Sequence, residues 1–397
     1  MLTAERVVVV DDSPLLRSMI TQALDALPGI TVIGQAGSGR EGLRQIEVLD
    51  PDIVSLDIEL GDISGLEVLE EVMRTKPRRV VVVSSQTEAG ADTTLRALAL
   101  GAVDFVAKGR LDPGPDGFEA RLAHAFEAAR HARVLPSRRR SERSAPPQRP
   151  RSAEERLADA RERRTAARRR QRSGGSDADA TRAGSATATP ARRRDTRLHK
   201  PELLLIASST GGPPALQEFF STLTVPPAMP TLIVQHMPEA FTSRLAARLD
   251  LAGPASVSEA AEGDRLRPGH VHLAKGGRHL GISGGRLSLL DTPPIGALKP
   301  RADVTFEQAV EVHGSKLLAV VLTGMGDDGL VGCRAVVQAG GQVLAQSAET
   351  STVDGMPQKV RNAGLHLDEG SPTYLAALID RLSGGRATMP ADAGRRS

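Results

Sequence analysis

Short apolar runs alternate with helical patterns over residues 1–135. Runs rich in β-branched residues predict strands at 6–10, 31–36, 53–57, 80–84 and 104–107. Between them apolar side chains recur with helical period, and the first such stretch begins at Ser13-Pro14, a favoured N-cap and first helical residue. Five strand–helix units of this kind predict an α/β domain with one doubly wound parallel sheet.

Residues 201–383 repeat this pattern and predict a second domain. Strands are expected at 203–207, 231–235 and 316–322, each followed by a turn of small or polar residues and then a helix. An alternating, glycine-rich stretch at 271–275, 279–283 and 286–290 is interpreted as β-hairpins. We therefore predict a second doubly wound, Rossmann-like domain with a β-hairpin insertion.

The segment between the domains, residues 136–200, differs in composition. It holds 19 arginines and one lysine against eight acidic residues, and apolar side chains larger than alanine are almost absent. Burial could not offset the entropy lost on ordering it, so we predict a long, disordered, basic linker, with a disordered tail at 384–397. Ser152 and Glu155 have capping-box spacing, so 152–172 could form a solvated helix. A basic run could also bind nucleic acid or acidic lipid.

Composition narrows the classes of function. Aromatic residues make up 2% of the 397 residues, and a stacking surface for single-stranded nucleic acid is not expected. No window approaches 18 continuous apolar residues, so no membrane insertion is expected. The single cysteine, Cys333, excludes an internal disulfide and a cysteine-based metal cage. We expect a cytoplasmic monomer without a specific nucleic-acid partner.

Charged and hydroxyl side chains follow the predicted strands of the first domain. Asp11 and Asp12 come after the first strand, Asp57 after the third, Ser84 after the fourth and Lys108 after the fifth. Parallel strands end at one edge of a sheet, so these groups should converge unless they are only turn residues. Converging carboxylates repel one another, and oxygen ligands with room for water and phosphate favour Mg²⁺. Asp57 would then accept a phosphoryl group, which Lys108 and Ser84 would contact.

These residues belong to segments that resemble response-regulator receiver domains: V-V-V-V-D-D-S-P, L-D-I-E-L-G-D-I-S-G, V-V-V-S-S and D-F-V-A-K. The resemblance implies a flavodoxin-like fold for residues 1–135 and phosphorylation of Asp57 by a histidine kinase. The implied Mg²⁺ ligands are Asp11, Asp12, Asp57 and the backbone carbonyl of Glu59. The implied switch residues, which report the phosphoryl group to the surface, are Ser84, Phe105 and Lys108.

A serine, a histidine and aspartates follow predicted strands of the second domain. S-S-T-G-G-P-P follows 203–207, H-M-P follows 231–235 and T-G-M-G-D-D-G follows 316–322. At one sheet edge these groups are the parts of a nucleophilic hydrolase, in which histidine takes the serine proton and aspartate fixes the imidazole tautomer. Glycine-rich turns expose N–H groups for an oxyanion.

Other interpretations of these motifs stay open. S-S-T-G-G-P-P could cradle a phosphate, although it lacks G-K-S/T and the G-x-G-x-x-G spacing. G-M-G-D-D-G could be a second phosphate loop or a turn with solvated aspartates. His270, His272 and His279 could bind a metal, but without a nearby carboxylate cluster the structural interpretation is favoured.

Four blocks of the second domain resemble, in order, the catalytic domain of chemotaxis protein-glutamate methylesterases: I-A-S-S-T-G-G-P-P-A-L, V-Q-H-M-P-E-A-F-T, A-K-G-G-R-H-L and L-T-G-M-G-D-D-G. The resemblance implies Ser209 as nucleophile, His236 as base and Asp328, not its neighbour Asp327, as the orienting acid. The implied supporting groups are the Thr210 hydroxyl, the Met325 backbone N–H for the oxyanion, and His279 near the pocket. No metal or cofactor is implied in this site.

A receiver domain followed by this catalytic domain is the whole architecture of that family. The resemblance therefore implies a phosphorylation-activated hydrolase that demethylates glutamate γ-methyl esters, and deamidates glutamines, on the cytoplasmic domains of methyl-accepting chemoreceptors. Its implied role is adaptation in chemotaxis, with a chemotaxis histidine kinase as partner. The alternative is a response regulator whose output is binding, either of nucleic acid through residues 136–200 or of a partner outside chemotaxis.

Overall fold

The computed structural model describes residues 4–85, 87–108, 117–134, 198–294 and 298–390. Almost all of the predicted linker at 136–200, including the helix expected at 152–172, lies outside these ranges, as does the end of the predicted tail. None of the described helices is both long enough and apolar enough to cross a membrane.

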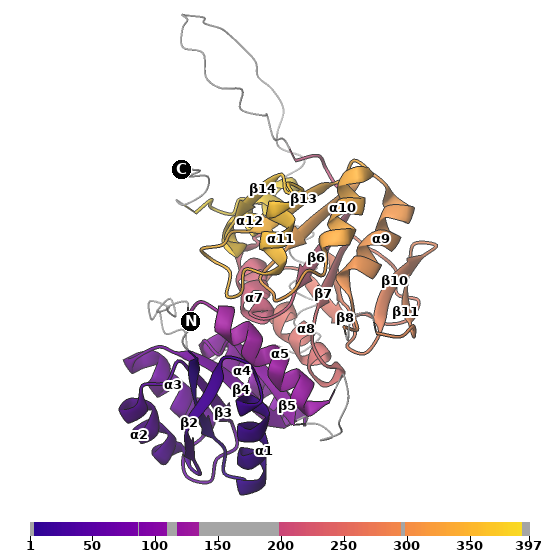
Figure 1. The fold of residues 1–397 in the computed structure, drawn as a ribbon. Helices are drawn as coiled ribbons and strands as arrows, with labels where there is room; N and C mark the ends of the chain where they lie inside the picture. The colour runs from indigo at the N-terminus through magenta and orange to yellow at the C-terminus, as the bar shows by residue number, and fades with distance from the viewer. Residues whose placement is uncertain (1–3, 86, 109–116, 135–197, 295–297, 391–397) are drawn as a thin grey trace, which may run out of the picture. The chain divides into compact units, whose positions relative to one another are not determined.

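The first sheet has five parallel strands in the order β2-β1-β3-β4-β5 (Figure 1). Its elements are β1 (Glu5–Val10), α1 (Pro14–Asp25), β2 (Ile30–Ala36), α2 (Gly39–Leu49), β3 (Ile53–Asp57), α3 (Gly65–Thr75), β4 (Arg79–Ser85), α4 (Glu88–Leu100), β5 (Asp104–Lys108) and α5 (Phe118–His131). The order is that of flavodoxin-like folds. All five predicted strands are present.

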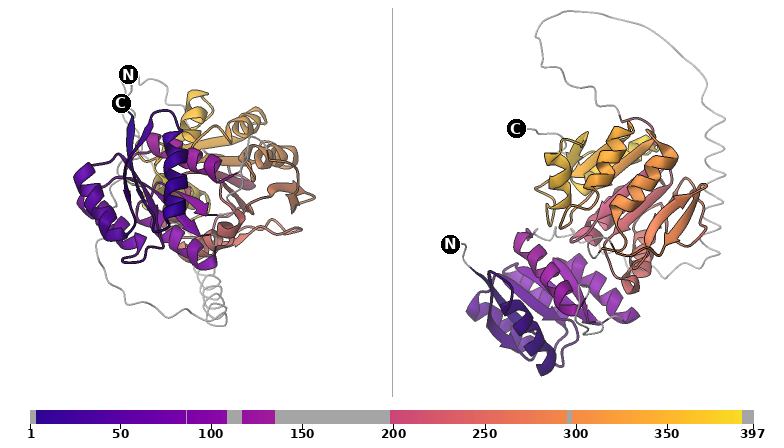
Figure 2. Two further views of the ribbon diagram at one scale, coloured as in Figure 1. Left: turned by 60° about the horizontal axis from the view of Figure 1, so that its bottom comes forward. Right: turned by 45° about the vertical axis from the view of Figure 1, so that its right-hand side comes forward.

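Helices cover both faces of this sheet (Figure 2), which explains the continuous apolar runs of its strands. Successive strand residues point to opposite faces. Val7 and Val9 of β1 belong to a cluster with residues of α1 and α5, whereas Val8 and Val10 belong to a cluster with residues of α2, α3 and α4.

The second sheet has seven strands in the order β14-β13-β12-β6-β7-β9-β8, and all paired neighbours are parallel. Its half of the chain contains β6 (Leu203–Ser208), α7 (Gly212–Thr222), β7 (Thr231–Gln235), α8 (Glu239–Ala252), β8 (Ser256–Glu259), β9 (His270–Leu273), β10 (His279–Ser283), β11 (Arg286–Leu290), α9 (Ala302–His313), β12 (Leu317–Val321), α10 (Leu330–Gln338), β13 (Gln342–Gln346), α11 (Met356–Asn362), β14 (Asp368–Gly370) and α12 (Pro372–Leu382). The predicted doubly wound second domain is therefore present.

The stretch at 271–275 differs from its prediction as part of a hairpin. Strand β9 lies in the main sheet, where it pairs in parallel with β7 and β8. Val271, His272 and Leu273 are all buried, as expected for a strand covered on both faces. The predicted hairpin insertion consists of β10 and β11, which pair antiparallel as a separate two-stranded sheet.

The strand order of the second sheet reverses between β6 and β12. The chain runs from β6 outward through β7 on one side and returns to β12 on the other. Ligand sites of open α/β sheets lie beyond the carboxyl ends of the strands at such a reversal. The loops after β6, β7 and β12 meet at this point, and they carry the motifs singled out in the sequence.

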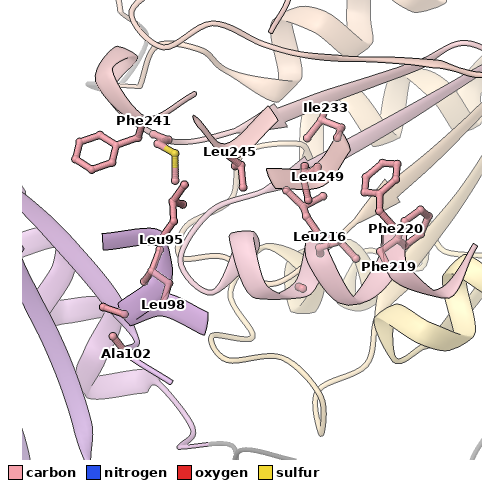
Figure 3. Close-up of a cluster of buried hydrophobic side chains, with 14 of the residues drawn as sticks. Leu95, Leu98, Ala102, Leu216, Phe219, Phe220, Ile233, Phe241, Leu245 and Leu249 are labelled. Atoms are coloured by element: carbon pink, nitrogen blue, oxygen red, sulfur yellow. The ribbon is translucent and has the colours of Figure 1, made fainter. Parts of the chain in front are cut away.

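An apolar cluster connects elements of the two halves. Leu95 and Leu98 of α4 share this cluster with Phe241 and Leu245 of α8, and Figure 3 shows these side chains together. The rings of Phe105 in β5 and Phe241 have centroids 4.5 Å apart. The first half of the chain therefore contacts the helix that begins shortly after His236.

Candidate active site

The turn after β6 presents two adjacent serines and then enters α7. Gly211 has a φ of 75°, a conformation that favours glycine, and a Cβ there would lie 2.5 Å from Cβ of Thr352. The Ser209 N–H donates to the Thr323 carbonyl at 3.0 Å, which ties this turn to the loop after β12.

The two serines have different surroundings. Ser208 is fully buried, and its hydroxyl donates to Oε1 of Gln235 at 2.7 Å. Ser209 is 4% exposed, and within the described ranges its hydroxyl makes no hydrogen bond. A Cβ on Gly324 would lie 2.8 Å from Cβ of Ser209, so the glycine-rich loop packs directly against Ser209. The geometry thus leaves Ser209, and not Ser208, available for chemistry.

His236 follows β7 and faces the loop after β12. Its N–H donates to the Ser208 carbonyl at 3.1 Å, which holds it beside the serine turn. Its ring Nε2 lies 2.6 Å from Oδ2 of Asp328. The structure therefore pairs His236 with Asp328, whereas Asp327 is exposed. The other ring nitrogen, Nδ1, makes no hydrogen bond within the described residues.

The Asp328 carboxylate is buried and receives several hydrogen bonds. The first two N–H groups of α9 donate to it, Ala302 to Oδ2 at 2.7 Å and Asp303 to Oδ1 at 3.0 Å. Burial by itself would raise the pKa of Asp328, but the bonds from His236 and from α9 outweigh it and lower the pKa below its ordinary value. Asp328 is therefore an ionised carboxylate at a helix N-terminus, where the helix dipole favours negative charge.

Sequence reasoning missed a second carboxylate beside Asp328. Asp303 accepts from the Gly332 N–H at 2.8 Å and from the Arg301 guanidinium at 3.1 Å. Arg301 Nε also lies 3.3 Å from Oδ1 of Asp328, so the Arg301 guanidinium forms ion pairs with both carboxylates. Burial raises the pKa of Asp303, and the neighbouring Asp328 charge adds to this. The R-A-D sequence at 301–303 reads as an ordinary first helical turn, so no motif pointed to this pair.

The loop that contains Met325 is anchored through Gly324 to residues 353–356. The Gly324 N–H donates to the Val353 carbonyl at 3.0 Å, and the Gly324 carbonyl accepts from the N–H groups of Gly355 and Met356. Gly326 has a φ of 92°, which favours glycine. The loop lies against Ser209 through Gly324, the residue before Met325.

Two predicted supporting residues have contacts that the sequence did not indicate. The Thr210 hydroxyl donates to Oδ2 of Asp104, a residue of β5 in the first sheet. His279 is fully buried, with Nδ1 accepting from the Arg301 N–H at 3.2 Å and Nε2 3.3 Å from the Pro293 carbonyl. Burial lowers the pKa of His279. His279 therefore holds the backbone of Arg301, whose side chain contacts Asp328.

The acidic group predicted in the first domain is present at the carboxyl edge of its sheet. Oxygens of Asp11, Asp12 and Asp57 lie within 4.8 Å of one another, the one such metal-type group in the described part of the chain. Lys108 Nζ lies 2.5 Å from Asp57 and 3.3 Å from Oδ2 of Asp11. That Oδ2 atom is buried and accepts no hydrogen bond among the described residues. An oxygen in this state, among three carboxylates, fits a hard divalent cation.

Burial raises the pKa of Asp57 to about 6, although Lys108 acts in the opposite direction. The Glu59 N–H donates to Oδ1 of Asp57 at 3.1 Å. Ser84 is buried one strand away, and its hydroxyl accepts from the Thr94 hydroxyl at 2.6 Å. Phe105 lies on the next strand of the sheet, and its ring contacts Phe241 in the second half of the chain.

Comparison with known proteins finds a matching family for each half of the chain. A family described as CheB methylesterase matches residues 204–379, and the response regulator receiver domain matches residues 7–112. The chain is 40% identical over 362 residues to the protein-glutamate methylesterase/protein-glutamine glutaminase of Symbiobacterium thermophilum, covering 90% of this chain and 91% of that protein. It is 38% identical to protein-glutamate methylesterase/protein-glutamine glutaminase 1 of Myxococcus xanthus, covering 88% and 89%. The solved catalytic domain of the Thermotoga maritima CheB methylesterase is 36% identical, with a TM-score of 0.44, covering 46% of this chain and 98% of that one.

Proposed function

Because the chain belongs to the protein-glutamate methylesterase/protein-glutamine glutaminase family, we propose that it demethylates glutamate γ-methyl esters on chemoreceptors by a Ser209–His236–Asp328 mechanism. The chain is an enzyme of this class, with a receiver domain preceding its hydrolase domain. We further propose that phosphorylation of Asp57 activates it. The observation that carries the proposal is the 2.6 Å contact between His236 and Asp328 beside the Ser209 turn.

The ester reaction follows from this arrangement. Nδ1 of His236 takes the Ser209 proton as Oγ attacks the ester carbonyl carbon, and the Asp328 carboxylate stabilises the imidazolium. The tetrahedral intermediate then expels methoxide, which leaves as methanol with the proton from His236. Water, activated by the same imidazole, hydrolyses the acyl-enzyme and releases the glutamate carboxylate and free Ser209. No hydrogen bond joins the Ser209 hydroxyl to His236 within the described residues, and catalytic bonds of this kind often form only when substrate is bound.

The oxyanion of the tetrahedral intermediate needs donors on the Ser209 side. The Met325 N–H is the proposed donor, because its loop packs against Ser209 and is held by Val353, Gly355 and Met356. Deamidation of glutamine uses the same steps, with the leaving amide nitrogen protonated by His236 and released as ammonia.

Asp57 is the proposed phosphoryl acceptor from a chemotaxis histidine kinase. Asp11, Asp12 and Asp57, with the Glu59 carbonyl, are the residues that would hold Mg²⁺. When bound, the ion would offset the repulsion between these carboxylates and the incoming phosphoryl group. Lys108, already at Asp57, would contact a phosphoryl oxygen.

Contacts between the receiver elements and the hydrolase support the proposed control. Asp104 accepts from Thr210, the residue after the nucleophile, and Phe105 contacts Phe241 of α8. Ser84 and Phe105 lie on neighbouring strands next to Asp57. Phosphorylation adds about 1.5 to 2 negative charges at Asp57, and a shift of these residues would weaken the contacts around Thr210.

Methanol release tests the proposal. The full-length chain, with Mg²⁺ and a small phosphodonor, is incubated with a methylated chemoreceptor cytoplasmic fragment. We expect methanol release that rises on addition of the phosphodonor and is lost in Ser209→Ala, with an unchanged circular dichroism spectrum. Methanol release by Ser209→Ala at the wild-type rate would overturn the proposal.

A further inference from the structure

We propose that Gln235 is a positioning residue. Its side-chain amide fixes the turn after β6, which carries Ser209, relative to the turn after β7, which carries His236. This inference rests on the proposed roles of Ser209 and His236. Gln235 is the last residue of β7, and its side chain is 2% exposed. It therefore does not touch substrate and acts through the residues that it holds.

The amide of Gln235 contacts both turns at once. Its Nε2 donates to the Ser209 carbonyl and to the His236 carbonyl, each at 3.0 Å. Its Oε1 accepts from the Ser208 hydroxyl at 2.7 Å. One planar group thus fixes the backbone of the nucleophile and the backbone of the base, which come from different strands.

The pattern of partners requires an amide in this orientation. Two carbonyl oxygens need two N–H donors, and a flipped amide would place its own oxygen against both. A glutamate would supply no donor and would bury a charge. A lysine would supply donors but no acceptor for Ser208. Glutamine is thus the side chain of this length that satisfies all three partners without a charge.

Gly212 lies against this amide, and its lack of a side chain leaves space for it. A Cβ on Gly212, the first residue of α7, would lie 1.9 Å from Oε1 of Gln235 and 2.9 Å from Cβ of Ser208. The second glycine of S-S-T-G-G therefore leaves the space that the Gln235 amide occupies.

Loss of the hydrogen bonds made by the Gln235 amide should lower turnover and leave substrate binding unchanged. A misplacement of about 1 Å between catalytic groups can lower a rate about 100-fold. For Gln235→Glu we expect kcat per active site to fall about 10- to 100-fold, with KM within about twofold of wild type. Gln235→Asn keeps an amide but is one methylene shorter, so a smaller loss is expected. The matched control is Gln342→Glu, at the amino end of strand β13 and so away from the strand carboxyl ends that carry the site, which should leave kcat unchanged.

The experiment uses the phosphodonor-activated full chain and methanol release from methylated receptor fragment. Active sites are titrated with a fluorophosphonate, so that rates refer to folded, reactive chains and a merely structural defect does not lower them. A fall in kcat per titrated site in Gln235→Glu and a smaller fall in Gln235→Asn support the inference. Wild-type kcat per site in both variants overturns it while leaving the proposed function intact. Activity in Ser209→Ala would instead overturn the proposed function and this inference with it.

Discussion

Asp328 and His236 meet through Oδ2 and Nε2 at 2.6 Å, at a point where the N-terminus of α9 donates two further hydrogen bonds to the same carboxylate. The acid that orients the base is thus held by a helix end as well as by the histidine. His236 and Asp328 are 92 positions apart in the sequence, and α9, which donates to Asp328, begins between them in the chain.

The first prediction concerns this carboxylate. Asp328→Asn keeps the shape but loses the charge that stabilises the imidazolium, so we expect kcat to fall by about 10²- to 10⁴-fold. Methanol release from methylated receptor measures the change. Asp327→Asn is the matched control, because Asp327 is exposed, and it should remain near wild type. Equal losses in the two variants would contradict the assignment.

The second prediction concerns the acidic group of Asp11, Asp12 and Asp57. Chelation of divalent cations should abolish the rise in rate caused by the phosphodonor and leave the basal rate unchanged, since no metal is proposed in the hydrolase site. Methanol release with and without phosphodonor, in the presence of EDTA or excess Mg²⁺, measures both rates. Stimulation by the phosphodonor that persists in EDTA would argue against a metal-dependent receiver.

The third prediction concerns Asp104, which accepts from the Thr210 hydroxyl. Asp104→Ala removes this contact, so the basal rate of the unphosphorylated chain should rise several-fold toward the activated rate. The rate with saturating phosphodonor should change little. Arg96→Ala, which removes an exposed ion pair between α4 and α3, is the control and should not change the basal rate. An unaltered basal rate in Asp104→Ala would show that this contact does not restrain the enzyme.

The fourth prediction concerns stability and pH. Asp380 is buried and accepts from the N–H groups of Thr224, Val225 and Ala387 and from the Thr224 hydroxyl. Burial would raise its pKa, but these donors together lower it. The stabilisation is therefore present above the unfolded-state pKa of about 3.9 and is lost as pH falls through the lower folded-state pKa.

Asp380→Asn should therefore lower the free energy of unfolding near neutral pH by about 1–3 kcal/mol. The difference from wild type should shrink below about pH 4. Chemical denaturation of both proteins across this range measures it. A difference that stays constant from pH 7 to pH 3 would mean that the carboxylate charge is not the source of the stabilisation.

The regular parts of the fold could be predicted because their cause is local. Val7 to Val10 are buried on both faces of a sheet, and such runs signal parallel strands. The strand at 271–273 was wrongly placed in a hairpin because its flanking glycines resemble hairpin turns, whereas its parallel pairing depends on distant β7. Strand β14 was not predicted, since Asp368, Glu369 and Gly370 carry no strand signal of their own.

The candidate site divides in the same way. Ser209, His236 and Asp328 follow strand ends, and the structure brings their three loops together there. Gln235 and Asp303 escaped prediction because each is defined by partners from other elements. Gln235 reads as the end of an apolar strand, and Asp303 as an acidic residue in a first helical turn. The Thr210–Asp104 contact joins residues from the two halves of the chain, so no local pattern in the sequence predicts it.

Labelling with a fluorophosphonate, which phosphonylates an activated serine, identifies the nucleophile. Full-length chain is treated with a fluorophosphonate, and the peptide that spans 203–222 is sequenced by tandem mass spectrometry. We expect an adduct on Ser209 that is retained in Ser208→Ala and absent in Ser209→Ala, with methanol release lost in step with labelling. An adduct on Ser208, or full hydrolytic activity in a chain labelled at Ser209, would contradict it.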